Sequence, residues 1–369
     1  MVRKVSFALI MLIAASLVAY PLGIWVVRDQ ITSMEKIERV VEIAKEVGAS
    51  RIYVQVVGRA DAYYKSEILP RAEALAEQPE DFDPLKEILA LAKENGIKVS
   101  AWINVFYAWP FGKRPVSEKH VINAHPDWVT CDSSGRSMLE YTSAPEVNTP
   151  GIFLEPALDE VKEFVASVAE EIAKNYDVDE IHLDYIRYPY KTFGYHPAAT
   201  KKYREWLKKA IAEKSVTNMA EAFDVFRRRQ VSETVKMIYE RVHKHGKKLS
   251  AAVFAYYEQD ALNQRLQEWI EWLKNGYLDY ACLMAYEDNK DTVTYYVKYA
   301  SEKLGSTEKI RVGLGAYKMV QIPERLYEIA EAVAGFQPDE ILIFSFENLL
   351  DENLRKYAAM IADTITKGR

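Results

Sequence analysis

Ionisable side chains share one face of a short apolar stretch near the middle of the chain, residues 179–190 (Asp-Glu-Ile-His-Leu-Asp-Tyr-Ile-Arg-Tyr-Pro-Tyr). Successive side chains of a β-strand point to opposite faces. His182 and Asp184 therefore share one face, and Ile181 and Leu183 share the other. Parallel α/β folds place their chemistry at the carboxyl ends of their strands. The pattern therefore predicts that Asp184 lies at the floor of a cleft.

A second carboxyl group would make glycosidic cleavage possible. Glycoside hydrolysis uses two carboxyl groups that flank one bond, one of them protonated and the other ionised or holding a water. Glu258 and Glu287 each follow a predicted strand. We expect Asp184 to be the nucleophile or stabilising carboxylate, with Glu258 or Glu287 as the acid. The alternative is that Asp184 pairs with Arg187 or Arg28 and holds the fold together.

Aromatic rings gather at the predicted strand ends and in the loops that follow them. Ring faces can stack on the C–H faces of a sugar, while tyrosine hydroxyls and tryptophan N–H groups bond to its hydroxyls. Part of these rings should instead pack the loops against the core. The predicted substrate-binding residues are Arg59, Trp102, Asn104, Tyr107, His182, Arg187, Tyr188, Tyr256, Tyr286, Tyr317 and Glu347.

Apolar strand-like segments alternate with segments of helical period after residue 21, which is typical of a parallel sheet. Strands are predicted at 22–28, 51–57, 98–104, 179–184, 248–254, 278–284, 310–315 and 340–346. Helices are predicted at 33–47, 84–95, 159–175, 198–213, 218–245, 261–274, 290–304, 323–334 and 350–366. This alternation favours an α/β fold of the (β/α)8 TIM-barrel type. A doubly wound open sheet is the alternative.

Two predicted connections, 58–84 and 105–156, are much longer than the usual few residues. They follow the second and third strands, so both should lie at the carboxyl face of the barrel. We expect them to form the walls of the cleft.

Composition excludes several classes of function. The formal net charge of −6 gives no basic surface for nucleic acid. The 369 residues include only two cysteines, Cys131 and Cys282, without a CxxC spacing, so thiolate metal binding and a disulfide framework are not expected. The histidines are scattered, and we predict no metal and no cofactor. A metal site at His182 and Asp184 is kept as an alternative.

The first twenty residues differ in kind from the rest. Arg3 and Lys4 precede an apolar run over 5–20, which is the pattern of a secretory signal and is short for a spanning helix. We therefore expect 1–20 to be a signal peptide and 21–369 to be one catalytic barrel outside the cytoplasm. An uncleaved signal anchor that tethers the barrel to a membrane is the alternative, and the oligomeric state stays open.

Five motifs in order resemble a known family. They are Gly-Ile-Trp-Val at 23–26, Val-Gly-Arg-Ala-Asp-Ala-Tyr-Tyr at 57–64, Ala-Trp-Ile-Asn-Val-Phe at 101–106, Ile-His-Leu-Asp-Tyr-Ile-Arg-Tyr-Pro at 181–189 and Leu-Ser-Ala-Ala-Val-Phe at 249–254. These segments are similar to the glycosyl-hydrolase-like family ten. The resemblance implies a (β/α)8 barrel, secretion and hydrolysis of glycosidic bonds in a polysaccharide. Some bacterial members cleave peptidoglycan glycan strands stripped of their peptides.

The fourth strand departs from two related patterns. Many members of that family carry two acidic residues in a row where this chain has Asp184 and then Tyr185. Chitinase-type barrels read Asp-Gly-x-Asp-x-Asp-x-Glu, and aligned on that motif this chain has His182 for the middle Asp and Ile186 for the catalytic Glu. The Met-Ala-Tyr-Glu at 284–287 is similar to the segment that holds an N-acetyl group there, so the sugar is expected to be N-acetylated.

Two rival functions stay open. The missing strand-four glutamate would fit a polysaccharide-binding barrel without turnover. The pair of His182 and Asp184 on one face would fit a metal-dependent hydrolase.

Overall fold

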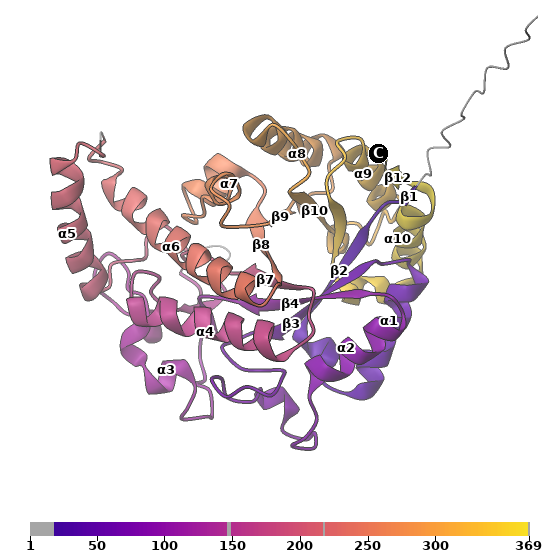
Figure 1. The fold of residues 1–369 in the computed structure, drawn as a ribbon, viewed down its shortest axis with the longest axis horizontal. Coiled ribbons are helices and arrows are strands. Elements are labelled where there is room, and N and C mark those ends of the chain that lie inside the picture. The colour runs from indigo at the N-terminus through magenta and orange to yellow at the C-terminus, as the bar shows by residue number, and fades with distance from the viewer. Residues whose placement is uncertain (1–17, 146–148, 217, 368–369) are drawn as a thin grey trace, which may run out of the picture.

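Eight parallel strands close into a barrel in the computed structural model, which describes residues 18–145, 149–216 and 218–367 (Figure 1). The strands are β2 (Leu22–Val26), β3 (Arg51–Val57), β4 (Lys98–Asn104), β7 (Glu180–Asp184), β8 (Lys248–Phe254), β9 (Tyr280–Met284), β10 (Ile310–Gly315) and β11 (Glu340–Phe344). They pair in this order, and β11 pairs with β2 to close the ring. The predicted (β/α)8 TIM barrel is confirmed, and the open-sheet alternative is wrong.

Helices surround the barrel and connect its strands (Figure 1). They are α1 (Met34–Glu46), α2 (Pro84–Glu94), α4 (Asp159–Asn175), α5 (Pro197–Ala212), α6 (Ala222–Lys244), α7 (Trp269–Lys274), α8 (Lys290–Leu304), α9 (Glu324–Ala334) and α10 (Glu352–Thr364). Side-chain caps start several of them: Asp83 accepts from the amide of Lys86 at α2, and Asn289 accepts from the amide of Thr292 at α8. No helix in the described ranges is long and apolar enough to cross a bilayer.

Two layers fill the inside of the barrel. Nearer the carboxyl ends lies an apolar layer of Trp25, Tyr53, Trp102, Cys282 and Leu342. Nearer the amino ends lies a charged cluster. Outside the ring, the aliphatic faces of the strands pack against the helices and form the main core.

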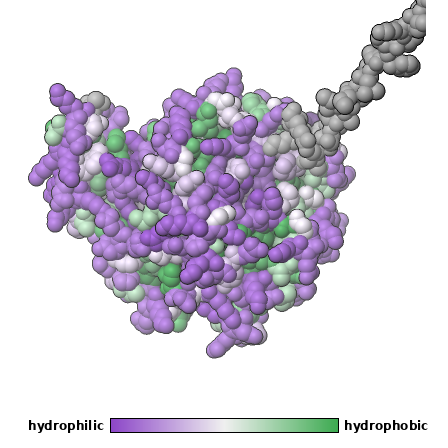
Figure 2. Space-filling view, viewed as in Figure 1, coloured by the Kyte–Doolittle hydropathy of each residue, from purple (hydrophilic) through white to green (hydrophobic). Residues whose placement is uncertain are grey.

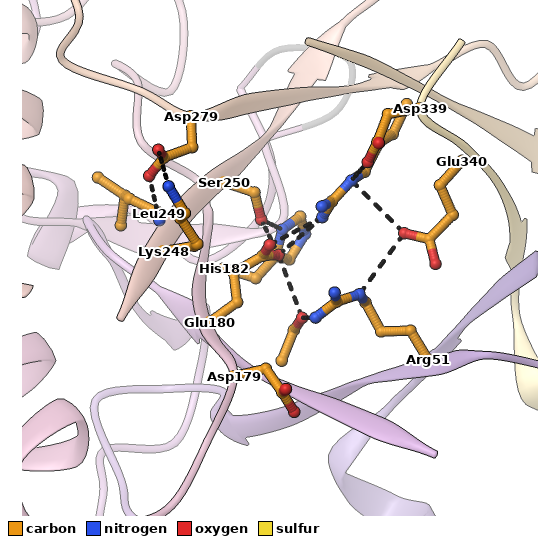
Figure 3. Close-up of polar contacts among 12 residues, drawn as sticks. Arg51, Asp179, Glu180, His182, Lys248, Leu249, Ser250, Asp279, Asp339 and Glu340 are labelled. Atoms are coloured by element: carbon orange, nitrogen blue, oxygen red, sulfur yellow. Dashed lines mark hydrogen bonds and ion pairs between the residues drawn. The ribbon is translucent and has the colours of Figure 1, made fainter. Parts of the chain in front are cut away.

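The charged cluster is centred on the buried Arg311. Its Nη1 lies 2.8 Å from Oε2 of Glu180, and its Nε lies 3.5 Å from Oε2 of Glu340. Arg51 lies 3.7 Å from the same Glu340 oxygen (Figure 3). Burial alone would raise the pKa of Glu180, but the nearby Arg311 and Arg51 outweigh it and lower that pKa to about 2. The cluster therefore joins β3, β7, β10 and β11 by ionised groups.

The two long loops behave differently from each other. The connection after β4 contains an antiparallel two-stranded sheet of β5 (Tyr107–Pro110) and β6 (Gly151–Phe153), with the short α3 (Val121–Ala124) between the two strands in the sequence. It contributes two residues to the wall of the cleft described below, whereas the connection after β3 contributes none. The prediction that both long loops line the cleft is therefore wrong for 58–84.

Two further features lie outside the ring. β1 (Val18–Ala19) pairs antiparallel with β12 (Thr366–Lys367), and the Tyr20 hydroxyl donates to the carbonyl oxygen of Pro338, 2.7 Å away. Both contacts lie at the amino-terminal face of the barrel. α5 stands off from the barrel and packs on α6 at the left of Figure 1. Figure 2 shows a surface of mainly hydrophilic residues on this side, with apolar ones scattered among them.

Candidate active site

A cleft of about 640 Å³ opens at the carboxyl ends of the barrel strands. Each of the eight strands contributes at least one residue to it, either from its carboxyl end or from the segment just after, so every strand of the ring positions part of the wall. The lining residues are Val27, Arg28, Gln55, Trp102, Asn104, Tyr107, Pro150, Asp184, Tyr185, Arg187, Phe254, Ala255, Tyr256, Asp260, Met284, Tyr286, Glu287, Tyr296, Tyr317 and Phe344. Both aromatic rings and charged groups line the wall, which suits a ligand with apolar faces and hydroxyl groups.

Asp184 ends β7 and faces this cleft. It is paired in register with Asn104 of β4, and its Oδ1 accepts a 2.6 Å hydrogen bond from the amide of Tyr185. Tyr185 has a φ of 49°, a left-handed conformation that is uncommon for a bulky residue. The strand therefore turns sharply just after the carboxylate.

The Asp184 carboxyl can hold a proton near neutrality. Burial raises its pKa to about 6, although the Tyr185 amide, the charge of Arg187 and the Trp102 indole all act in the opposite direction. No ion pair joins it to Arg187 or Arg28 among the described residues. The alternative in which an arginine neutralises Asp184 for stability is not what this geometry shows.

Asn104 is held by its neighbours on β3 and β4. Its Oδ1 accepts from Trp102 Nε1 at 3.0 Å and from Gln55 Nε2 at 3.3 Å, and its Nδ2 donates to the Gly58 carbonyl at 2.8 Å. These contacts use both ends of the amide. Asn104 therefore fixes the positions of Trp102 and Gln55 beside Asp184.

Arg28 brings a positive charge to the β2 side of the cleft. Its Nη1 donates to Gln55 Oε1 at 2.8 Å, and within the described chain it forms no ion pair with a carboxylate. A Cβ on Gly58 would lie 2.4 Å from Cδ of Arg28. The absence of a side chain at position 58 is therefore what lets the arginine lie in this place.

Arg187 is a second guanidinium at the cleft, and it is only 5% exposed. Its Nη1 donates to the carbonyl oxygens of Tyr188 and Pro189, and its charge lies 4.8 Å from the ring centre of Tyr185 and 5.2 Å from that of Phe254. Burial lowers its pKa. No described acceptor takes a hydrogen bond from its Nε or Nη2, which leaves these donors for a ligand.

Asp260 and Glu287 also face the cleft, from the segments that follow β8 and β9. Burial raises the pKa of Asp260, the charge of Arg265 opposes this, and the negative charge of Glu287 adds to it. Glu287 lies 2.8 Å from Nζ of Lys318. Together with Asp184, these carboxyls follow three consecutive strands of the ring, β7, β8 and β9.

His182 lies below the cleft and is fully buried. Its Nε2 is 3.0 Å from Nε1 of Trp25, which can only donate, so Nε2 is the acceptor and Nδ1 carries the proton. Nδ1–H then donates to Ser250 Oγ at 2.8 Å, and that hydroxyl donates to Glu180 (Figure 3). Burial lowers the pKa of His182 to about 3. Both ring nitrogens are engaged, so the imidazole has no place for a substrate or a metal.

Four other predicted site residues do not line the cleft. Arg59 pairs with Asp61 at 3.0 Å, and Tyr188 donates to Glu155 at 2.7 Å in the core. Glu347 accepts from Ser345 at 2.5 Å in the turn after β11. The Glu258 side chain is 60% exposed and accepts from the Tyr299 hydroxyl at 2.5 Å.

The structure brings together the other predicted residues, which are Trp102, Asn104, Tyr107, Asp184, Arg187, Tyr256, Tyr286, Glu287 and Tyr317. Sequence reasoning missed the roles of Arg28, Gln55 and Asp260. Gln55 lies on a β3 position that alternation assigns to the inner face, together with Tyr53. Arg28 could not be found this way, because it follows the end of β2 in the turn Arg28–Ile31. Asp260 could not be found this way, because a π-helical turn, Tyr257–Leu262, follows β8 and shifts which residue faces inward.

The described residues contain no group of three or more His, Cys, Asp or Glu side chains placed to hold a metal ion. Cys131 and Cys282 are free and buried. The groups that the cleft does offer are carboxyls, guanidiniums, amides and aromatic rings. They are suited to acid–base chemistry on a polyhydroxylated ligand.

Comparisons with known proteins agree with this chemistry. The glycosyl hydrolase YngK of Bacillus subtilis is 25% identical over 209 residues, covering 55% of this chain and 36% of the relative. The glycosyl hydrolase DigH of Escherichia coli K12 is 24% identical over 155 residues, covering 38% of this chain and 31% of the relative. The chain thus matches about a third of the length of these curated relatives.

A solved structure with the same fold is the glycoside hydrolase domain of PgaB (BpsB) from Bordetella bronchiseptica. It superposes with a TM-score of 0.71 at 14% identity, covering 93% of this chain and 99% of that domain. A family model, glycosyl hydrolase-like 10, matches residues 17–327. The chain belongs to the glycosyl hydrolase-like 10 family.

Proposed function

We propose that the protein hydrolyses O-glycosidic bonds inside a polysaccharide that contains N-acetylated sugars. The observation that carries this proposal is Asp184, a carboxyl with a pKa of about 6 at the floor of a cleft that Asp260 and Glu287 also face. A carboxyl with this pKa is protonated in part of the molecules near neutral pH. It can therefore give a proton to a leaving oxygen without a cofactor.

The proposed reaction uses the two sides of the cleft differently. Asp184 donates its proton to the glycosidic oxygen as the bond from that oxygen to the anomeric carbon breaks. The ionised carboxylate of Asp260 or Glu287 stabilises the positive charge that develops on the sugar ring, or activates the water that adds to it. The water supplies a hydroxyl to the anomeric carbon, and its remaining proton restores the acid. The role reverses our sequence-based assignment, in which Asp184 was the ionised group.

The rest of the cleft would hold the sugar. Trp102, Tyr286 and Tyr317 present rings to the ligand space, where a pyranose face can stack. Arg28 and Arg187 offer guanidinium donors that no described carboxylate neutralises. These can bond to sugar hydroxyls or to the carbonyl oxygen of an acetamido group.

Reducing-end release by the purified protein tests the proposal. Suitable substrates are peptide-free glycan strands of peptidoglycan and oligomers of β-1,4-linked N-acetylglucosamine. We expect turnover by the wild type and a fall of about a hundredfold or more for Asp184→Asn, since one acid–base group supplies about that factor. Asp127→Asn, an exposed carboxyl outside the cleft, is the matched control. Equal turnover by Asp184→Asn and the wild type would remove Asp184 from the mechanism.

We also propose that the barrel works outside the cytoplasm, either released or tethered by its N-terminal segment. The support is the sequence pattern of residues 1–20, most of which lie outside the described ranges. Fractionation of cells that express the full chain tests this, with the size of the recovered protein showing whether the segment is removed. Recovery of the activity in the cytoplasmic fraction alone would contradict it.

A further inference from the structure

A second cavity of about 320 Å³ adjoins the cleft on its β8 and β9 side. It is lined by Ala255, Tyr256, Tyr257, Glu258, Gln259, Asn263, Tyr295, Tyr296 and Tyr299. Ala255, Tyr256 and Tyr296 belong to the walls of both spaces. The two spaces are therefore neighbours that share part of one wall.

Tyrosine rings dominate this second cavity. Tyr256 follows β8, while Tyr295, Tyr296 and Tyr299 come from α8, and the centres of neighbouring rings lie between 5.8 and 6.4 Å apart. We call these four residues the tyrosine platform. Tyr295 is 51% exposed and Tyr256 is 37% exposed. Rings that pack a core are buried, so this degree of exposure for clustered rings needs another explanation.

The π-helical turn Tyr257–Leu262 serves both spaces. Asp260 faces the cleft, whereas Glu258 and Gln259 line the second cavity. Glu258 accepts from the Tyr299 hydroxyl at 2.5 Å and lies 3.9 Å from Nζ of Lys303. The carboxylate has two oxygens and further lone pairs, so it can also accept hydrogen bonds from ligand hydroxyls. One turn therefore positions an acid–base candidate and a polar binding group a few residues apart.

We propose that the tyrosine platform and Glu258 bind sugar units of the same glycan chain beyond the units held in the cleft. This inference rests on the proposed function and deepens it. Exposed aromatic faces with nearby carboxylate and amide groups match the alternating apolar and hydroxyl surfaces of a sugar chain. The substrate is then a polymer cleaved at internal bonds, and short oligosaccharides fill the cleft alone.

The test compares ligand lengths in a protein that does not consume the ligand. Calorimetric titration of Asp184→Asn with the dimer and the hexamer of β-1,4-linked N-acetylglucosamine gives the reference affinities. Adding Tyr295→Ala should weaken hexamer binding about three- to tenfold and leave dimer binding unchanged, since one aromatic contact is lost. Tyr295→Phe keeps the ring and should bind as the reference protein does.

A matched control separates recognition from folding. Tyr357 on α10 is partly exposed and lines neither space, so Tyr357→Ala should change neither affinity. Equal losses for the dimer and the hexamer, an unchanged hexamer affinity in Tyr295→Ala, or no hexamer binding by the reference protein would each overturn the platform.

Reducing-end release decides the proposed function separately. Hydrolysis by a Tyr295→Ala protein whose hexamer affinity is unchanged would reject the platform and keep the glycosidase. Binding that depends on ligand length, without turnover of any polymer, would keep the platform and reject the glycosidase.

Discussion

Trp25 donates its indole N–H to Nε2 of His182 across the inside of the barrel, over 3.0 Å. This contact fixes the tautomer of a histidine that lies two residues before Asp184 on the same strand. The histidine donates a hydrogen bond from Nδ1 to the Ser250 hydroxyl, which in turn donates to the ionised Glu180. The polar chain below the cleft is thus satisfied within the protein, and Asp184 is the group on this strand that faces the ligand space.

The pH dependence of hydrolysis should follow Asp184. Because the proposed acid must be protonated, activity should fall as the pH rises through about 6, the pKa that burial gives this carboxyl. Measurement of kcat/KM for one oligosaccharide between pH 4 and 9 locates this limb. Asp184→Asn should lose the limb together with most of the activity. A profile that is flat across pH 6 would argue against Asp184 as the proton donor.

Asp184 should also cost stability at neutral pH. Its unfolded pKa is near 3.8 and its folded pKa about 6, so between these values the folded state binds more protons and stability falls as the pH rises. At pH 7 the penalty is about 2–3 kcal/mol. Urea unfolding of Asp184→Asn and the wild type should show the variant gaining stability at pH 7 and little at pH 4. A gain of equal size at both pH values would contradict the shift.

His182 should stay neutral well into acid. Burial lowers its folded pKa to about 3, so below the unfolded value of 6.5 only the unfolded chain takes up this proton. The stability contribution of His182 is therefore complete above pH 6.5 and is lost progressively as the pH falls toward 3. Nitrogen chemical shifts of the ring should show the Nδ1–H form unchanged from pH 8 to 5. Titration of this ring near pH 6.5 would refute the buried hydrogen-bonded chain from Trp25 through His182 to Ser250. Ser250→Ala removes the partner of Nδ1 and should weaken the preference for the Nδ1–H form.

Arg311 should be among the residues least tolerant of change. Arg311→Met would leave Glu180 and Glu340 buried without their central partner, at a cost of about 3–5 kcal/mol. Arg39→Met removes a pair with Glu42 at the surface and should change stability by less than about 1 kcal/mol. Urea unfolding of both variants makes the comparison. Similar small losses in the two proteins would show that the cluster matters little.

Gly58 should affect binding rather than folding. In Gly58→Ala the new Cβ would lie 2.4 Å from Cδ of Arg28, so the guanidinium must move away from Gln55. We expect KM to rise several-fold with a nearly unchanged melting temperature. Gly335→Ala, at the end of α9 and away from the cleft, is the control. A KM equal to that of the wild type would show that Arg28 does not contact substrate.

Much of the fold could be predicted from local sequence. Period-two and helical patterns located all the barrel strands, because each strand is aliphatic on its outer side wherever helices cover it. The segment after β8 escaped this reasoning. A single helix at 261–274 was expected, but the π-helical turn Tyr257–Leu262 comes first and α7 starts at Trp269. Local propensity does not encode such a turn, whose position depends on packing against α8.

The candidate site was predictable where strand alternation governs it. Trp102, Asn104 and Asp184 face inward as their positions in β4 and β7 require. Alternation does not tell how deep an inward residue lies, so it could not separate the buried His182 from Asp184 at the cleft. Strand alternation does not apply to loop residues such as Arg59, because the orientation of a loop side chain depends on long-range contacts.

The pairing of β1 with β12 has a practical consequence for how the molecule can be presented. Anything joined to residue 18 or residue 367 starts from the amino-terminal face, on the side away from the cleft. A purification tag, a solid support or an added module attached there leaves the mouth of the barrel unobstructed. A long polymer could therefore approach an immobilised molecule from the free side, which suits surface-based measurements of glycan capture.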